Sequence, residues 1–242
     1  MSDSAPIAES LGVDYFKRDS RLTNLQIKYS LRARRRLFDR FTAFLGDDLE
    51  GMSILDVGAT PDTERADSNC MVPWLLDRGA HVTMCSRENL DHLADRYPGV
   101  DILQPNTGKI PVPDDSFDAL ISSATIEHVG NEAAQRAFIT DCARVAGRIG
   151  LTTPNRGHWL EFHTKFPLLH WLPRRVHQRL LDAMGQGVWA TEDHLRLLGK
   201  RDLMRLGQEA TGGRYRCQVE TVTSLGMTSN LLLLVESRQR HE

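Results

Sequence analysis

Two neighbouring polar residues have the chemistry best suited to proton transfer. Glu127 and His128 follow an apolar segment, and a histidine that titrates near neutral pH can take a proton from an attacking hydroxyl group. A later segment also holds polar and aromatic side chains, and there His163 is a second candidate base. We expect Glu127, Trp159 and Glu161 to contact a substrate. The alternative for the first pair is structural, with Glu127 near the start of a helix and His128 packed against a loop.

A second candidate site is the turn that follows the short apolar segment at residues 53–57. Asp56 stands close to the end of this segment, and Gly58 follows it directly. A glycine after a strand lets the backbone turn tightly and lets a ligand approach closely. Asp56 therefore either contacts a ligand or caps the backbone of the turn. No G-x-G-x-x-G sequence follows Val57, which disfavours a dinucleotide site.

The elements that must position these residues alternate between strands and helices. The sequence predicts strands at 53–57, 81–85, 100–103, 117–122 and 148–152, and helices at 70–78, 88–96 and 132–145. This rhythm indicates a parallel sheet with helices on both faces. Strands at 214–222 and 230–236 are joined by a turn too short for a parallel crossover. We expect an α/β fold with a doubly wound, mostly parallel, seven-stranded, Rossmann-like sheet that ends in an antiparallel hairpin.

The chain divides into two expected parts. Residues 1–50 hold an N-terminal tail and an amphipathic helix at about 27–45, and residues 51–242 form the main domain. An insertion at about 155–213 follows a strand, so we expect it to lie as a cap over the ligand crevice. Pro167 and Pro173 disfavour a long helix in this insertion.

The N-terminal helix carries a cluster of arginines. It comprises Arg32, Arg34, Arg35, Arg36 and Arg40. Such a cluster could contact an anionic or lipid-linked substrate, but we expect it to be the solvated face of the helix.

Four segments in order resemble motifs of one enzyme family. Residues 54–58 (ILDVG) resemble the first motif of the class I methyltransferases that depend on S-adenosylmethionine (SAM). Residues 116–123 resemble their fourth-strand motif, 126–129 the segment after it, and 150–155 their fifth-strand ending. The terminal hairpin is also how that fold ends. The resemblance covers roughly residues 53–154 and implies SAM as the cofactor.

The resemblance also implies which residues lie beside the cofactor. They are Asp56, Gly58, Ala59, Thr60, Ser86, Arg87, Asn106, Thr107, Ser123 and Ala124. Three positions depart from the family pattern. The first loop keeps only one glycine. Ser86 stands where an acid usually binds the ribose, unless Glu88 reaches back to take that role. Asn106 replaces the acid that usually binds adenine, and its amide oxygen could still accept a hydrogen bond.

The leading functional hypothesis is transfer of a methyl group from SAM to an oxygen or nitrogen atom of a small-molecule acceptor. A metabolite, a sugar or a secondary-metabolite scaffold would suit. The alternative is a catalytically inactive binding or partner protein with the same fold, which the single glycine and the neutral Ser86 and Asn106 would explain.

The composition limits the expected partners and the expected cellular compartment. The formal net charge is −2, so nothing in it indicates nucleic acid as a partner. The longest purely apolar run, at 231–235, is too short for stable membrane insertion, and no secretory signal is visible. The four cysteines lie far apart with no metal-type spacing, so we expect no metal site and a reducing cytoplasm. The oligomeric state is left open.

Overall fold

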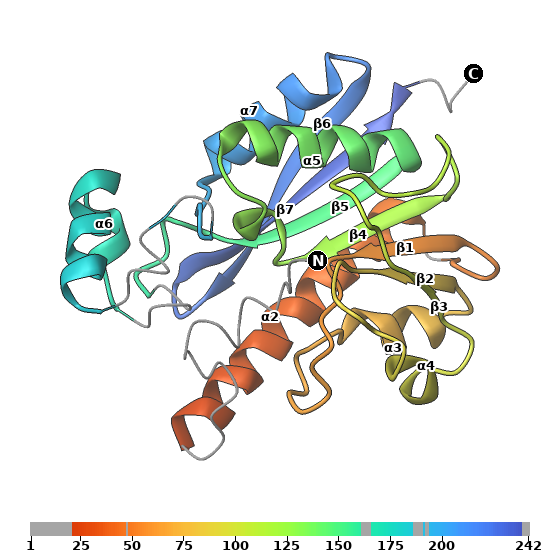
Figure 1. The fold of residues 1–242 in the computed structure, drawn as a ribbon, viewed down its shortest axis with the longest axis horizontal. Coiled ribbons are helices and arrows are strands. Elements are labelled where there is room, and N and C mark those ends of the chain that lie inside the picture. The colour runs from red at the N-terminus through yellow and green to blue at the C-terminus, as the bar shows by residue number, and fades with distance from the viewer. Residues whose placement is uncertain (1–20, 47, 161–165, 186–190, 192–193, 239–242) are drawn as a thin grey trace, which may run out of the picture.

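A seven-stranded sheet forms the centre of the molecule (Figure 1). The computed structural model describes residues 21–46, 48–160, 166–185, 191 and 194–238. The strands are β1 (Ser53–Val57), β2 (His81–Cys85), β3 (Asp101–Leu103), β4 (Ala119–Ser123), β5 (Arg148–Pro154), β6 (Tyr215–Ser224) and β7 (Met227–Ser237). Their order across the sheet is β3-β2-β1-β4-β5-β7-β6. This confirms the predicted mostly parallel sheet with a C-terminal antiparallel hairpin.

The strand order creates a switch point beside β1. The chain moves from β1 to β2 and β3 on one side, then crosses over and places β4 on the other side of β1. All of these neighbours are parallel, and only β7 is antiparallel to its two partners β5 and β6. Ligands in open α/β sheets bind outside the carboxyl ends of the strands at such a switch point. The topology therefore directs attention to the ends of β1 and β4.

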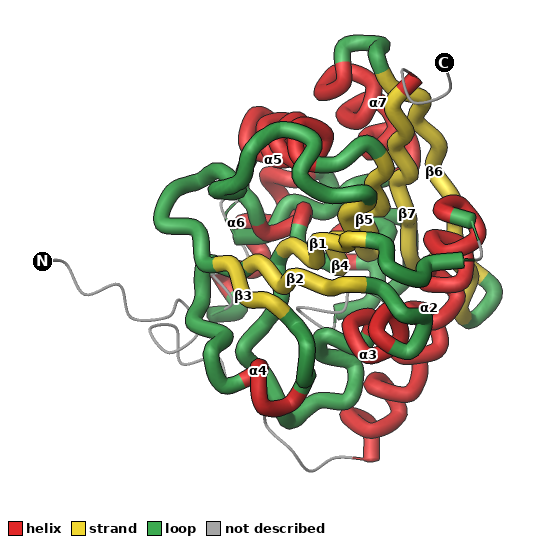
Figure 2. Tube along the Cα trace, turned by 90° about the vertical axis from the view of Figure 1, so that its right-hand side faces the viewer, coloured by secondary structure: helices red, strands yellow, loops and turns green. Residues whose placement is uncertain are grey.

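Helices cover both faces of the sheet (Figure 2). One face carries α2 (Arg21–Leu45), α3 (Met71–Leu76) and α4 (Leu93–Arg96), and the other carries α5 (Glu132–Val145) and α7 (Lys200–Thr211). Each layer has its own core of buried apolar side chains. Two 3-10 helices, η1 (Ile126–His128) and η2 (Leu169–Trp171), and the helix α6 (Arg174–Ala183) complete the described elements.

Helix α2 packs closely on the sheet because β5 has a glycine beneath it. Leu37, Phe38 and Phe41 are each 1% exposed. A Cβ atom on Gly150 would come within 2.5 Å of the Phe41 ring, so only glycine leaves room for this contact. The predicted apolar face of the N-terminal helix is thus confirmed at these positions, and the helix is tied to the middle of the sheet.

One helix prediction needs correction, and one helix was not predicted. The predicted helix at 88–96 is only Leu93–Arg96, because the Asn89 side chain accepts a 2.9 Å hydrogen bond from the Asp91 backbone N–H and holds a turn. The insertion contains a ten-residue helix, α6, that begins directly after Pro173. Proline is compatible with a helix start, where its missing N–H leaves no bond unmade. Of the helices described, none is long and apolar enough to cross a membrane.

Candidate functional site

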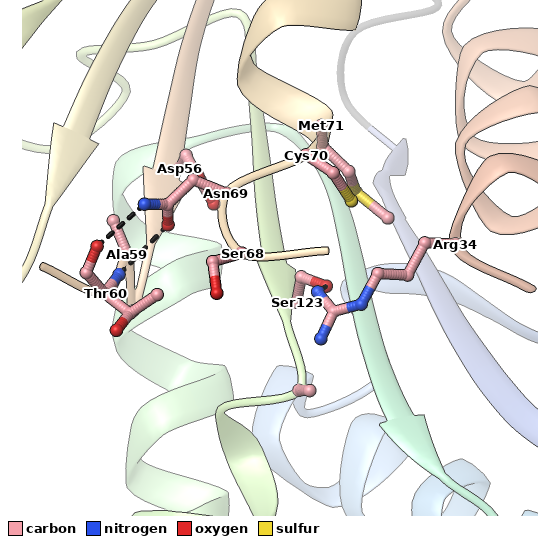
Figure 3. A pocket seen from close by; sticks show the side chains of 11 residues that line it. Arg34, Asp56, Ala59, Thr60, Ser68, Asn69, Cys70, Met71 and Ser123 are labelled. Atoms are coloured by element: carbon pink, nitrogen blue, oxygen red, sulfur yellow. Dashed lines mark hydrogen bonds between the residues drawn. The ribbon is translucent and has the colours of Figure 1, made fainter. Parts of the chain in front are cut away.

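A cavity of about 160 Å³ lies at the carboxyl ends of β1 and β4 (Figure 3). Its walls come from the turn after β1, the segment before α3, the end of β4 and helix α2. The lining residues are Arg34, Asp56, Gly58, Ala59, Thr60, Ser68, Asn69, Cys70, Met71, Ser123 and Ala124. The cavity therefore occupies the switch point of the sheet.

Asp56 supplies a buried carboxyl group to this cavity. Its residue is 5% exposed, and no hydrogen bond to its carboxyl group is formed within the described part of the chain. Burial raises the pKa of Asp56 to about 7, although the nearby positive charge of Arg34 acts in the opposite direction. An unpartnered buried carboxyl group has a strong tendency to bind a donor or a cation.

Arg34 brings a positive charge to the opposite side of the cavity from Asp56 (Figure 3). Its Nη1 donates a 2.8 Å hydrogen bond to Oγ of Ser123, and its Nε donates a 3.3 Å bond to Oγ of Ser30. The expectation that the arginine cluster is solvated is wrong for this one member. The other four are exposed, namely Arg32, Arg35, Arg36 and Arg40. Arg34 therefore reaches from α2 to the end of β4, where Ser123 lines the cavity.

Two reciprocal hydrogen bonds connect the loop after β1 to the segment before α3. The Thr60 backbone N–H donates to Oδ1 of Asn69 at 3.0 Å, and Nδ2 of Asn69 donates to the Thr60 carbonyl at 2.7 Å. Asn69 has a φ of 49°, a left-handed conformation that asparagine tolerates better than most residues. These two bonds connect two segments of the cavity lining that are nine residues apart in sequence. The loop is therefore pre-organised without a second glycine.

Gly58 is required by both its conformation and its neighbour. Its φ is 90°, and a Cβ atom there would come within 2.1 Å of Oγ1 of Thr125. Ala124, which also lines the cavity, has a φ of 55°. Strained backbone of this kind costs energy and gathers at ligand sites.

Six of the ten positions expected beside the cofactor line the cavity. They are Asp56, Gly58, Ala59, Thr60, Ser123 and Ala124. Sequence reasoning did not include Arg34, Ser68, Asn69, Cys70 or Met71 among the contacts. Asn69 directly precedes the predicted helix at 70–78, and this position was the available signal. Burial raises the pKa of the Cys70 thiol to about 11, so this group stays neutral at physiological pH.

The other four expected contacts follow β2 and β3 and lie outside the cavity lining. Ser86 is buried, and its Oγ accepts a 3.2 Å hydrogen bond from the Glu88 backbone N–H. Arg87, Asn106 and Thr107 are exposed. Because β2 and β3 are neighbours in the sheet, these residues stand at one edge, and their roles stay predictions.

Glu127 and His128 lie on η1, directly after the cavity residues at the end of β4. The Glu127 side chain is fully buried, and its Oε2 accepts a 2.9 Å hydrogen bond from Oγ1 of Thr153. His128 is exposed, and its Nδ1 lies 2.8 Å from the His194 carbonyl. A carbonyl oxygen can only accept, so this bond places a proton on Nδ1. In the neutral ring the lone pair is then on Nε2, the arrangement that a general base needs.

The remaining predicted substrate contacts belong to the insertion. Trp159 is half-buried beside the ring of His158, with 5.8 Å between the ring centres. Glu161 and His163 lie outside the described residues. Across the described part of the chain, no three His, Cys, Asp or Glu side chains form a group able to hold a metal ion.

Comparison with known proteins relates part of this site to one family. Residues 68–152, which include much of the cavity wall and the β4 motif, match the methyltransferase domain family. The matched segment, about a third of the chain, therefore resembles a methyltransferase domain. A probable SAM-dependent methyltransferase of Mycobacterium tuberculosis is 38% identical over 68 residues, which are 27% of this chain. The match spans 24% of that relative, about a quarter of its length.

Solved structures agree on the methyltransferase fold. The 1,6-didemethyltoxoflavin-N1-methyltransferase of Burkholderia thailandensis has a TM-score of 0.55 and 12% identity, with 91% of this chain and 92% of that chain covered. Magnesium protoporphyrin IX methyltransferase from Synechocystis has a TM-score of 0.57 and 13% identity, with 92% and 90% covered. At these identities the likeness concerns the fold alone.

The cavity fits one part of SAM, the cofactor named for the relatives that the chain resembles. The amino-acid end of SAM carries an ammonium group and a carboxylate. The cavity offers the buried Asp56 carboxyl group on one side and the Arg34 guanidinium on the other, a complementary pair of charges (Figure 3). A ligand of the size of SAM needs a site of at least roughly 300 Å³. The cavity at β1 and β4 is therefore large enough for only part of the molecule.

Proposed function

We propose that this protein transfers a methyl group from SAM to an oxygen or nitrogen atom of a small-molecule acceptor. The observation that carries the proposal is the pairing of Asp56 with Arg34 across the cavity at the switch point. When bound, SAM supplies a methyl group already activated by a sulfonium centre. The work left to the protein is then chiefly to position donor and acceptor and to exclude water.

The cofactor-binding assignment follows from the chemistry of the lining. Asp56 would accept from the ammonium group of the amino-acid end, and Arg34 would bind its carboxylate. Gly58 and Ala59 would form the wall behind it, and the rest of the cofactor would extend toward Ser86 at the end of β2. This direction is supported by the sheet, because β1 and β2 are parallel neighbours and their carboxyl ends share one edge.

His128 is the residue we assign as the general base where the acceptor must lose a proton. It lies five residues after Ser123, which lines the cavity, and its ring is oriented by the His194 carbonyl. With a proton fixed on Nδ1, Nε2 can take the proton of an acceptor hydroxyl or ammonium group. Glu127 supports the same segment from its buried position.

Two assays test the proposal in sequence. Calorimetry with SAM and with S-adenosylhomocysteine should show binding of both, and transfer of tritium from methyl-labelled SAM to a panel of acceptors should then show turnover. His128→Gln should lower turnover by roughly 10²- to 10⁴-fold and leave the Kd for SAM unchanged. Failure of both ligands to bind at millimolar concentration would contradict the proposal and favour an inactive partner protein.

We also propose a cytoplasmic location. The four cysteines are all free thiols, and three of them are buried. Free thiols of this kind persist in a reducing compartment.

A further inference from the structure

Helix α6 and the 3-10 turn before it carry an apolar surface that nothing in the described structure covers. Most of the large apolar side chains that are exposed in the described part of the chain are here: Leu168 and Trp171 are 49% exposed, and Met184 is 44% exposed. In Figure 1 the helix stands apart from the sheet and its two helical layers. We call this surface, formed by Leu168, Trp171, Leu172, Val176, Leu180 and Met184, the cap face.

The cap face is a continuous stripe because of its spacing. Leu172, Val176, Leu180 and Met184 recur every four residues, so those on the helix lie one above another. The neighbouring side of α6 packs on the protein, since Leu181, about 100° round the helix from Leu180, is fully buried with Leu195 and Leu197. One edge of the apolar surface is therefore buried, and the stripe beside it faces outward.

A row of positive charge borders the stripe. Arg175 and Arg179 are exposed and each precedes a stripe residue, Val176 or Leu180, by one position. The helix sequence RRVHQRLLDA contains three arginines and a single acid, Asp182. Its apolar and polar sides are thus sharply separated while its mean hydropathy stays low, which is typical of helices that lie in a membrane surface.

The start of the cap face is held in a fixed position. The His158 carbonyl lies 2.7 Å from Nε2 of His170 and accepts a 3.1 Å hydrogen bond from Nε1 of Trp171. The indole nitrogen is therefore satisfied while half of the residue stays exposed. Tryptophan favours the boundary between headgroups and acyl chains, where its ring is apolar on one side and polar on the other.

We propose that the cap face docks on the surface of an anionic phospholipid bilayer. The apolar stripe would enter the boundary below the headgroups, and Arg175 and Arg179 would extend to the phosphates while their aliphatic stems stay on the apolar side. Charge complementarity selects this partner, because a neutral apolar surface would leave the arginine row without a counter-charge. The docked helix would place the insertion at the membrane surface, on the side of the sheet where the carboxyl ends of β1 and β4 form the cavity.

Vesicle sedimentation tests the proposal without cofactor or acceptor, so its outcome is independent of methyl transfer. The full chain should bind vesicles of 30% phosphatidylglycerol in phosphatidylcholine at least roughly tenfold more strongly than pure phosphatidylcholine vesicles, and less strongly in high salt. Emission from tryptophan should shift to the blue on binding, and Trp171→Phe should remove most of that shift.

Matched variants separate the two parts of the surface. Arg175→Glu with Arg179→Glu, and separately Val176→Glu with Leu180→Glu, should each weaken anionic vesicle binding roughly tenfold or more. Arg216→Glu is the control, since Arg216 is exposed on β6 and far along the sheet from the insertion. Its neighbour in β7 is Glu236, which lies opposite the first residue of β5, whereas the insertion follows the last residue of β5. It should change binding less than twofold. All positions changed are exposed, and circular dichroism would verify that each variant folds.

Several outcomes would overturn the proposal. Equal binding to neutral and anionic vesicles, or no binding to either, would exclude an anionic bilayer as the partner. Equal loss of binding in Arg216→Glu would show a general charge effect. A dimer detected by sedimentation equilibrium without lipid, and dissociated by Val176→Glu with Leu180→Glu, would instead assign the cap face to a second copy of the chain.

Discussion

Arg34 and Ser123 are joined by a 2.8 Å hydrogen bond between residues 89 positions apart in the chain. The bond connects helix α2, which precedes the first strand, to the end of β4, and it aims a guanidinium into the cavity that also holds Asp56. The N-terminal helix therefore forms part of the cavity wall and also covers the sheet.

Removal of the Arg34 charge should weaken cofactor binding. Arg34→Ala removes the only described guanidinium in the cavity lining, and a hydrogen-bonded charge contributes roughly 1.5–3 kcal/mol. We expect the Kd for SAM, measured by calorimetry, to rise roughly 10- to 100-fold. Arg32→Ala is the control, since Arg32 is exposed on the same helix. An equal effect of both substitutions would show that α2 acts through its general charge.

Substitution of Asp56 should change stability in a way that depends on pH. The carboxyl group ionises near 3.8 ordinarily and near 7 in the folded protein, so the folded state holds the extra proton between these values. The free energy of unfolding therefore falls as pH rises from about 4 to 7. Above pH 7 the carboxylate is ionised in both states, and its burial destabilises the folded protein. Asp56→Asn should raise the free energy of unfolding at pH 8 by up to about 4 kcal/mol, with the gain vanishing toward pH 4.

The same Asp56→Asn variant should lose cofactor affinity, because the amide carries no charge for the SAM ammonium group. Urea unfolding at several pH values and calorimetry at pH 8 measure the two effects separately. A variant that is no more stable than the wild type at pH 8 would contradict the assigned burial effect. Unchanged SAM binding would contradict the role given to Asp56.

The sheet and the centre of the site were predictable because their signals are local. Asp56 lies near the end of a short apolar strand, and Gly58 follows that strand directly. Both the strand and the turn glycine can be recognised in the sequence itself. Asn69 was not predicted as a contact, because its exchange of hydrogen bonds with Thr60 depends on how the intervening loop folds.

Arg34 and helix α6 show why other features could not be predicted. Four of the five clustered arginines are exposed, and the inward position of Arg34 depends on the packing of α2 on the sheet, where Phe41 lies over Gly150 and Arg34 reaches Ser123. In the insertion, Pro173 disfavours a helix that contains it but permits one that starts after it, so the pattern alone was ambiguous.

Gly58→Ala should destabilise the fold more than an equivalent change elsewhere. Both Gly58 and Gly99 have a left-handed backbone, with φ of 90° and 86°, but a Cβ atom on Gly99 meets nothing within 4 Å. Gly99→Ala should therefore lower the free energy of unfolding by about 1–2 kcal/mol from backbone strain alone. Gly58→Ala adds the clash with Thr125, worth roughly 1–3 kcal/mol more. Thermal unfolding of the two variants checks the difference, and equal losses would show that Thr125 moves aside freely.

Arg196 should link stability to turnover through the segment that carries His128. The residue is 5% exposed, its side chain donates to Gln135 and Glu132, and its backbone N–H donates a 2.8 Å bond to the Glu127 carbonyl on η1. Arg196→Met keeps the backbone bond to Glu127 but leaves Oε1 of Gln135 without its donor and Glu132 paired with Arg205 alone, so we expect a loss of roughly 1–3 kcal/mol in the free energy of unfolding.

Arg205 provides the matched control for this network. It pairs with the same Glu132 carboxylate at 2.7 Å but is 44% exposed, so Arg205→Met should leave the free energy of unfolding nearly unchanged. Because Arg196 holds residues 194–198 against η1, its substitution should also disturb the His194 carbonyl that orients His128. We therefore expect Arg196→Met to lower kcat for methyl transfer while the Kd for SAM stays within about twofold, since no cavity residue contacts Arg196 through a described hydrogen bond. A parallel loss of SAM binding would show that the network supports the cofactor cavity itself.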